Sequence, residues 1–138
     1  SEGEIAKLQA SYKTMLKVYY QAVQPMGGTL IMDRFYQSEL VYGSMIRGYD
    51  PYNDGFYKEL ESRVRHEPHL YLEIFAEEGD ILKRMEIKGE DYLKQEMVPK
   101  IMKGYLDYKA NHCTLNSLRV RSSEANVNGI VEKYASTI

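Results

Sequence analysis

Residues 30–43 read LIMDRFYQSELVYG, a short apolar run followed by an acid, an arginine and a helical pattern. With Thr29 before it, the apolar run predicts a buried strand over 29–32, and the apolar spacing after it predicts a helix over 34–46. Open α/β sheets bind ligands outside the carboxyl ends of their parallel strands. Arginine suits phosphate groups, and aspartate can hold a metal or accept a proton. The stretch therefore predicts a ligand site at Asp33 and Arg34.

The rest of the chain alternates between helical and strand-like patterns. Ser1 and Glu4 fit a capping box that opens a helix ending near Gln24. Because strands that alternate with helices form right-handed crossovers, we expect an α/β fold with a parallel sheet flanked by helices, in a single domain over 1–138. Further helices are expected around 56–64, over 77–87, over 92–110 and after Ser122 or Ser123, with strands over 70–76 and 114–120.

Composition excludes several classes of function. A net charge of −2 argues against broad electrostatic binding to nucleic acid, which requires a basic face. No apolar run approaches the roughly 20 residues of a membrane span. The single cysteine, Cys113, excludes an intramolecular disulfide and fits a reducing compartment, so we expect a cytoplasmic protein without a membrane partner.

The motif over 33–42, Asp-Arg-aromatic-x-x-Ser-x-x-small-Tyr, resembles the signature of thymidylate kinases and related deoxynucleoside and deoxynucleotide kinases of the P-loop class. The resemblance implies that Arg34 holds the acceptor phosphate, that Tyr42 belongs to the base and sugar pocket, and that Asp33 lies near Mg²⁺ and the reacting phosphates. Ser38 matches the motif serine and is expected to support the pocket. Four-residue steps from Arg34 through Ser38 to Tyr42 would place all three on one helix face.

Two neighbouring residues extend this expected pocket. Glu39 can reach toward the same opening, and Arg47 can contact the substrate from the loop that follows. Gly43 departs from the family, whose members commonly carry a base-reading glutamine there, so the base stays open. A plainer interpretation also stands, in which Asp33 only caps a helix and Arg34 is a solvated surface residue.

A second segment resembles the lid of the same kinases. Arg84 and Lys88 lie four residues apart on an expected helix, followed by an acidic and aromatic stretch. Cations on a closing lid stabilise the phosphoryl group in transfer. A solvated, basic helix end explains the two residues equally well. Ser122-Ser123-Glu124 resembles a strand-to-helix turn that lies near the adenine of ATP in this family, and helix capping is again the alternative.

The phosphate-binding loop Gly-x-x-x-x-Gly-Lys-Ser/Thr does not occur in the sequence. In the resembled fold this loop follows the central first strand. We therefore expect the carboxyl-terminal part of a P-loop-kinase-like fold, without its first strand and loop. A sheet that lacks its central strand would expose two unpaired edges, which favours a segment absent from these 138 residues over a natural loss.

The sequence thus leads to three hypotheses. The first is a deoxynucleotide kinase that transfers the γ-phosphoryl group of ATP to a nucleoside monophosphate with Mg²⁺, with Asp33, Arg34 and Arg84 as catalytic residues. The second is a deoxynucleoside kinase in which Asp33 acts as base on the 5′-hydroxyl. The third is an inactive kinase-like module that binds a nucleotide or a protein partner. Because kinases of this family often pair through helices, a homodimer through the first helix is a further expectation.

Overall fold

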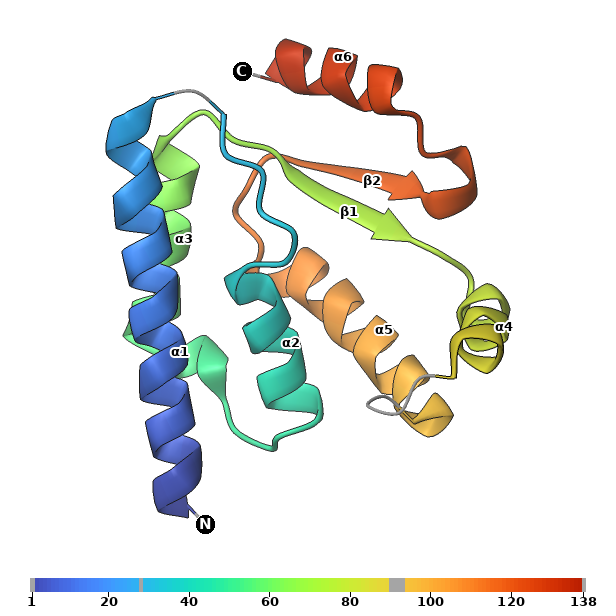
Figure 1. The fold of residues 1–138 in the computed structure, drawn as a ribbon, viewed down its shortest axis with the longest axis horizontal. Helices are drawn as coiled ribbons and strands as arrows, with labels where there is room; N and C mark the ends of the chain where they lie inside the picture. The colour runs from blue at the N-terminus through green and yellow to red at the C-terminus, as the bar shows by residue number, and fades with distance from the viewer. Residues whose placement is uncertain (1, 28, 90–93, 138) are drawn as a thin grey trace. The chain divides into compact units, whose positions relative to one another are not determined.

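The computed structural model describes residues 2–27, 29–89 and 94–137 (Figure 1). The chain has two compact units, residues 1–39 and residues 40–138. The fold is mixed α/β and mostly helical, and no helix in the described residues is both long and apolar enough to cross a membrane. The elements are α1 (Glu2–Val23), α2 (Tyr36–Met45), α3 (Gly55–His66), β1 (Tyr71–Phe75), α4 (Glu78–Lys88), α5 (Val98–Asp107), β2 (Ser117–Arg121) and α6 (Val127–Thr137).

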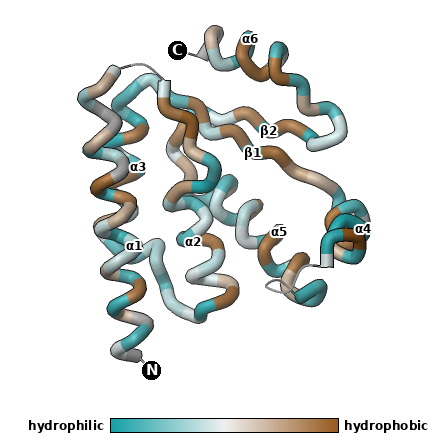
Figure 2. The backbone as a smooth tube through the Cα atoms, in the orientation of Figure 1, coloured by the Kyte–Doolittle hydropathy of each residue, from teal (hydrophilic) through white to brown (hydrophobic). Residues whose placement is uncertain are grey.

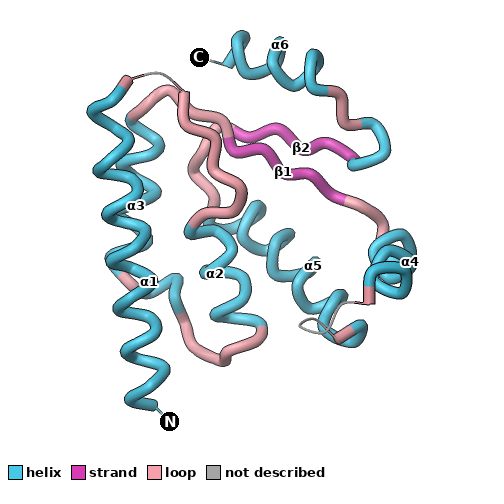
Figure 3. The backbone as a smooth tube through the Cα atoms, viewed as in Figure 1, coloured by secondary structure: helices cyan, strands magenta, loops and turns pink. Residues whose placement is uncertain are grey.

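The first helix agrees with the sequence, but the expected strand over 29–32 is wrong. Thr29 to Met32 form an exposed loop (Figure 3), and the side chain of Ile31 is 87% exposed. A parallel strand exists only where neighbouring strands pair its backbone groups. The sheet of the described residues contains β1 and β2 alone, so the apolar run has no strand partner there.

The sheet itself confirms the expected parallel pairing. β1 pairs with β2 in parallel, from Tyr71 opposite Ser117 to Phe75 opposite Arg121. The chain between the two strands contains α4 and α5, so the connection is a helical crossover as expected for parallel strands. Figure 2 shows hydrophobic residues along both strands. A small two-stranded parallel sheet is therefore present.

Capping residues explain where several helices begin and end. The Asp54 carboxylate accepts the Phe56 N–H at 3.0 Å and opens α3. Gly89 ends α4 with a φ of 66°, a left-handed conformation that glycine adopts easily, and its N–H donates to the Met85 carbonyl at 2.9 Å. Residues 90–93, where the expected helix over 92–110 begins, lie outside the described residues.

The last helix begins later than Ser122 or Ser123 predicted. Residues 122–124 form a 3₁₀ turn, and α6 begins at Val127. The side-chain oxygen of Asn126 accepts the Gly129 N–H at 3.1 Å, so Asn126 provides the cap that we expected from serine. Asparagine caps a helix as well as serine does, so the residue type alone does not show whether the helix begins after a serine at 122–123 or after Asn126.

The core of the second unit lies among α2, α3 and α5. Gly104 on α5 is buried so close to Val41 and Met45 of α2 that a Cβ atom at position 104 would lie 2.8 Å from Val41 Cγ1. The helix α5 continues into a π-helical turn over Tyr108–His112. The buried side chains of this unit include Leu40, Val41, Tyr57, Leu60, Met85, Val98, Ile101, Tyr108 and Leu115.

Candidate functional site

The Asp33–Arg34 motif lies in the exposed segment between α1 and α2, in the first unit. Helix α2 begins at Tyr36, so Phe35 occupies the residue before the helix and its carbonyl accepts the Ser38 N–H at 3.1 Å. Asp33 lies two residues further out, which does not favour its interpretation as a simple cap. Both motif side chains are exposed to solvent.

Arg34 has a left-handed backbone with a φ of 63°, and no other non-glycine residue of the described segments has a positive φ. This conformation costs an L-residue about 1–2 kcal/mol. Such local strain is concentrated at functional sites. The left-handed backbone also places Arg34 outside the helix, so the expected shared helix face is wrong for Arg34 and holds for Ser38 and Tyr42 only.

The other expected pocket residues lie on α2 or directly after it. Ser38, Glu39 and Tyr42 are half-buried on this helix, with Glu39 in its first turn. Arg47 follows the helix as an exposed residue, and its backbone N–H donates to the Tyr42 carbonyl at 3.0 Å. The boundary between the two compact units follows Glu39, so Asp33, Arg34, Ser38 and Glu39 belong to the first unit and Tyr42 and Arg47 to the second.

Gly43 has a packing reason to be glycine. A Cβ atom at this position would lie 2.7 Å from Cζ of the Tyr49 ring. Real Cβ atoms do not approach other atoms this closely, so any larger residue must displace the ring. A glutamine, the residue of the resembled kinases, therefore does not fit beside Tyr49 in this arrangement.

The carboxyl ends of β1 and β2 carry a group of charged and polar side chains around one aromatic ring, which we call the sheet-end cluster: Phe75, Glu77, Arg84, Arg121 and Ser122. Glu77 follows β1 and forms an ion pair with Arg121, the last residue of β2. Nη2 of Arg84, on α4, donates to Oγ of Ser122 at 3.1 Å. The expected lid arginine and the expected strand-to-helix turn are thus brought together, although 38 residues separate them.

Two arginines at this end of the sheet, Arg121 of the cluster and Arg119, were not among the site residues expected from the sequence. Cζ of Arg119 lies 3.7 Å from the centroid of the Phe75 ring, and Cζ of Arg121 lies 5.1 Å from it. Arg119 also forms an ion pair with Glu73 at 3.3 Å. Arg119 lies in the strand expected over 114–120 and Arg121 directly after it, and the alternation Arg-Val-Arg was the signal that both share one face of the sheet.

Lys88 lies in the last turn of α4, one helical turn after Arg84, and both side chains are exposed. The acidic and aromatic stretch expected after them, at 90–92, lies outside the described residues. Arg119 and Arg121 each form an ion pair with a carboxylate, whereas in the described part of the chain Arg84 and Lys88 form none.

A second group of side chains surrounds the π-helical turn. The rings of Tyr52 and His112 stack at 3.8 Å, and Nε2 of His112 lies 3.5 Å from Oδ2 of Asp107. His112 and Cys113 are adjacent in the chain, and the fold places the Asp107 carboxylate beside the imidazole. The Cys113 thiol is directed to the Leu115 carbonyl at 4.0 Å rather than to the imidazole, which gives no support for nucleophilic catalysis.

Burial, followed by the carboxylates of Asp107, Asp50 and Glu61, raises the pKa of Tyr52 from 10.0 to about 12. The neutral phenol therefore stabilises the fold fully below pH 10.0, and this contribution is lost as the pH rises toward 12.

At neutral pH, Tyr52→Phe should preserve or slightly raise stability, because the hydroxyl is buried without a hydrogen-bond partner among the described residues. Above pH 10.0, the variant should lose less stability than the wild type. Urea unfolding of both proteins from neutral pH to above pH 10.0 checks this prediction. A difference in their free energies of unfolding that does not change with pH would contradict it.

The described residues contain no group of three histidine, cysteine, aspartate or glutamate side chains that could hold a metal ion. Asp33 is a single exposed carboxylate. Mg²⁺ is commonly bound through one or two carboxylates together with substrate phosphates. Asp33 therefore fits a role toward Mg²⁺ that arrives with a nucleotide.

Comparison with protein-family models, with curated proteins and with solved structures found no match to this chain.

Proposed function

We propose that this chain binds nucleotides and acts as a deoxynucleotide kinase, transferring the γ-phosphoryl group of ATP to a nucleoside monophosphate with Mg²⁺. The observation that carries the proposal is the hydrogen bond from Arg84 to Ser122. It joins the two segments that resemble the ATP side of such kinases. It does so at the carboxyl ends of parallel strands, where open α/β sheets bind their ligands.

Each site residue has its own role in the proposed phosphoryl transfer. Arg34 is exposed and presents a planar fork of donors, which suits the phosphate of the acceptor. Phosphoryl transfer is catalysed mainly by positioning and by stabilising negative charge. Arg84 and Lys88 supply cations for the group in transfer, and Arg84 is oriented by Ser122. Asp33 organises the acceptor and the nucleotide-bound Mg²⁺, which neutralises phosphate charge when it is bound.

The test for the proposal is turnover with ATP and Mg²⁺ against a panel of nucleosides and their monophosphates. Arg34→Ala should lower kcat/KM for the monophosphate about a hundred-fold or more, since a charged contact to the transferring groups is lost. Arg34→Lys should recover only part of this loss, because it keeps the charge but not the fork.

The matched control is Arg65→Ala, which removes an exposed arginine on α3 outside the proposed site. It should leave turnover unchanged. Consumption of nucleosides instead of monophosphates would favour a deoxynucleoside kinase, in which Asp33 takes the proton of the 5′-hydroxyl. Equal losses in Arg34→Ala and Arg65→Ala would contradict the role of Arg34.

A second candidate is a kinase-like module that binds nucleotide without catalysis. The sequence favours it in one respect, because the chain contains no glycine loop to cradle the donor phosphates. Calorimetric titration with a nucleoside monophosphate separates the two candidates. Binding that requires Arg34, without turnover, supports the module, and the absence of both binding and turnover would remove both candidates.

A further inference from the structure

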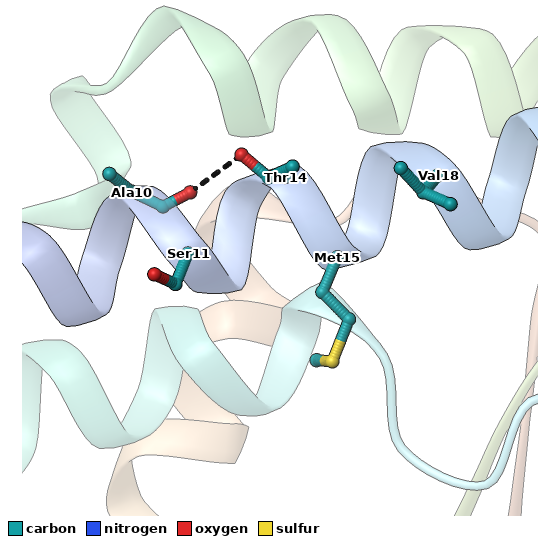
Figure 4. Close-up of a pocket in the computed structure, with 5 residues that line it drawn as sticks. All are labelled: Ala10, Ser11, Thr14, Met15 and Val18. Atoms are coloured by element: carbon teal, nitrogen blue, oxygen red, sulfur yellow. Dashed lines mark hydrogen bonds between the residues drawn. The ribbon is translucent and has the colours of Figure 1, made fainter.

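The side-chain hydrogen bonds of the structure differ in how far along the chain they reach. In the shallow hollow on α1, the Thr14 hydroxyl donates to the Ala10 carbonyl at 2.9 Å, within a single helix (Figure 4). The hydrogen bond between His69 and Asn116 instead joins segments that are 47 residues apart. A change at His69 therefore acts on the pairing of distant segments rather than on one helix.

His69 connects the segments that precede β1 and β2. It is half-buried two residues before β1, and its Nε2 lies 2.9 Å from the backbone nitrogen of Asn116, the residue before β2. The Asn116 carbonyl in turn accepts the Tyr71 N–H at 2.8 Å. These two hydrogen bonds hold the amino ends of the two strands together.

The partners of the two ring nitrogens define the protonation state of the His69 imidazole. Nδ1 lies 2.7 Å from the Glu67 carbonyl oxygen, which can only accept, so Nδ1 carries the proton. Nε2 faces the Asn116 N–H, which can only donate, so Nε2 is unprotonated. Both hydrogen bonds can therefore be made only by the neutral imidazole, because a protonated Nε2 would set two donors against each other.

The groups around His69 do not offset the cost of protonating it. Among the described residues, no carboxylate forms an ion pair with His69, and Glu67 contacts the ring through its backbone carbonyl. The Glu61 carboxylate, on α3, accepts hydrogen bonds from the segment before β2. The Cys113 thiol is directed to a backbone carbonyl. Burial raises the pKa of Tyr71, so this phenol stays neutral wherever histidine titrates.

The other two histidines respond to protonation in the opposite sense. His66 lies in the last turn of α3, where the helix dipole favours a cation, and its Nδ1 lies 2.6 Å from the Ser62 carbonyl oxygen. Nε2 of His112 lies 3.5 Å from Oδ2 of Asp107, a contact that protonation strengthens. Of the three histidines in the chain, His69 is thus the one at which acid breaks a hydrogen bond.

We propose that His69 is a pH-sensitive switch at the start of the sheet, which holds Asn116 beside β1 when it is neutral and releases it when it is protonated. Histidine changes its charge between about pH 5 and 8. The folded chain resists a proton that the unfolded chain accepts, so this contribution to stability is present above that range and is lost as the pH falls through it. The inference does not depend on the proposed kinase activity, because the sheet-end cluster lies at the opposite ends of the strands.

Amide hydrogen exchange of the full chain, followed by NMR, tests the proposal at Asn116. Between about pH 7.5 and about pH 5.5, the protection factor of the Asn116 amide should fall about ten-fold in the wild type, because its acceptor is lost. His69→Gln places an amide oxygen, which does not titrate, near the position of Nε2, so protection in this variant should not change with pH. The matched control is His66→Gln, which should behave like the wild type.

Urea unfolding over the same pH range provides an independent measurement. On acidification, the unfolding equilibrium constant of the wild type should rise about ten-fold more than that of His69→Gln. Carboxylates titrate at lower pH and are common to both proteins, so their effect cancels in this comparison. An Asn116 protection factor that stays constant with pH in the wild type overturns the proposal. An equal fall in His69→Gln overturns it too, as does a loss of the pH effect in His66→Gln.

Discussion

Tyr108→Ala is expected to lower the free energy of unfolding by about 4 kcal/mol, within the range observed for truncating large buried aromatic residues. Tyr108 is fully buried at the start of the π-helical turn. Its ring packs edge-on against Tyr71 with a centroid distance of 5.7 Å, and its hydroxyl donates to Oε1 of Glu61 at 2.6 Å. The substitution removes the ring contact and a charge-assisted hydrogen bond together.

The hydroxyl and the ring can be separated by a second variant. Tyr108→Phe keeps the ring and should cost about 1–3 kcal/mol, the range for leaving a partly buried partner without its hydrogen bond. The other carboxylate oxygen of Glu61 still accepts from the Thr114 hydroxyl at 3.0 Å, which places this cost toward the lower end. Urea unfolding at neutral pH measures both variants, and equal losses in them would show that the ring contributes nothing.

The sequence predicted the local elements of the fold well, because helix periodicity and capping act over a few residues. The predicted first helix and the predicted strand over 70–76 are confirmed almost to the residue as α1 and β1. The prediction of a strand over 29–32 was wrong because a parallel strand requires more than apolar residues. It also requires a neighbouring strand to pair with, and the local sequence pattern does not show whether one is present. Asn126 was missed as a cap because serine and asparagine serve equally well at that position.

The candidate site shows the same division between local and non-local information. Arg84 and Ser122 were each singled out from their own segments, but their hydrogen bond joins residues far apart in the chain and depends on the parallel pairing of β1 with β2. The left-handed conformation of Arg34 has no signal in its residue type, since glycine and asparagine are the residues that favour it. Asp107 reaches His112 only because a π-helical turn follows α5.

Gly104→Val is expected to destabilise the fold by about 3 kcal/mol, the upper part of the range for overpacking a core. A Cβ at this position on α5 would lie 2.8 Å from Cγ1 of Val41 and 2.9 Å from Cγ of Met45 on α2. Val41 is fully buried, so it cannot move into solvent. Gly104→Ala should cost less, because alanine gains about 1 kcal/mol of helix propensity over glycine.

The control is Gly129→Ala on α6, where the nearest atom to a new Cβ is Asn126 Cβ at 4.0 Å. This variant gains helix propensity without a clash and should be neutral or slightly stabilising. If the contact between α2 and α5 is the cause, adding Val41→Ala to Gly104→Ala should cost less than the sum of the two single changes. Additive costs in urea unfolding would contradict the packing explanation, because residues in direct contact should couple. Coupling would show that glycine at position 104 is required by the close approach of two helices, since local helix propensity alone would favour alanine there.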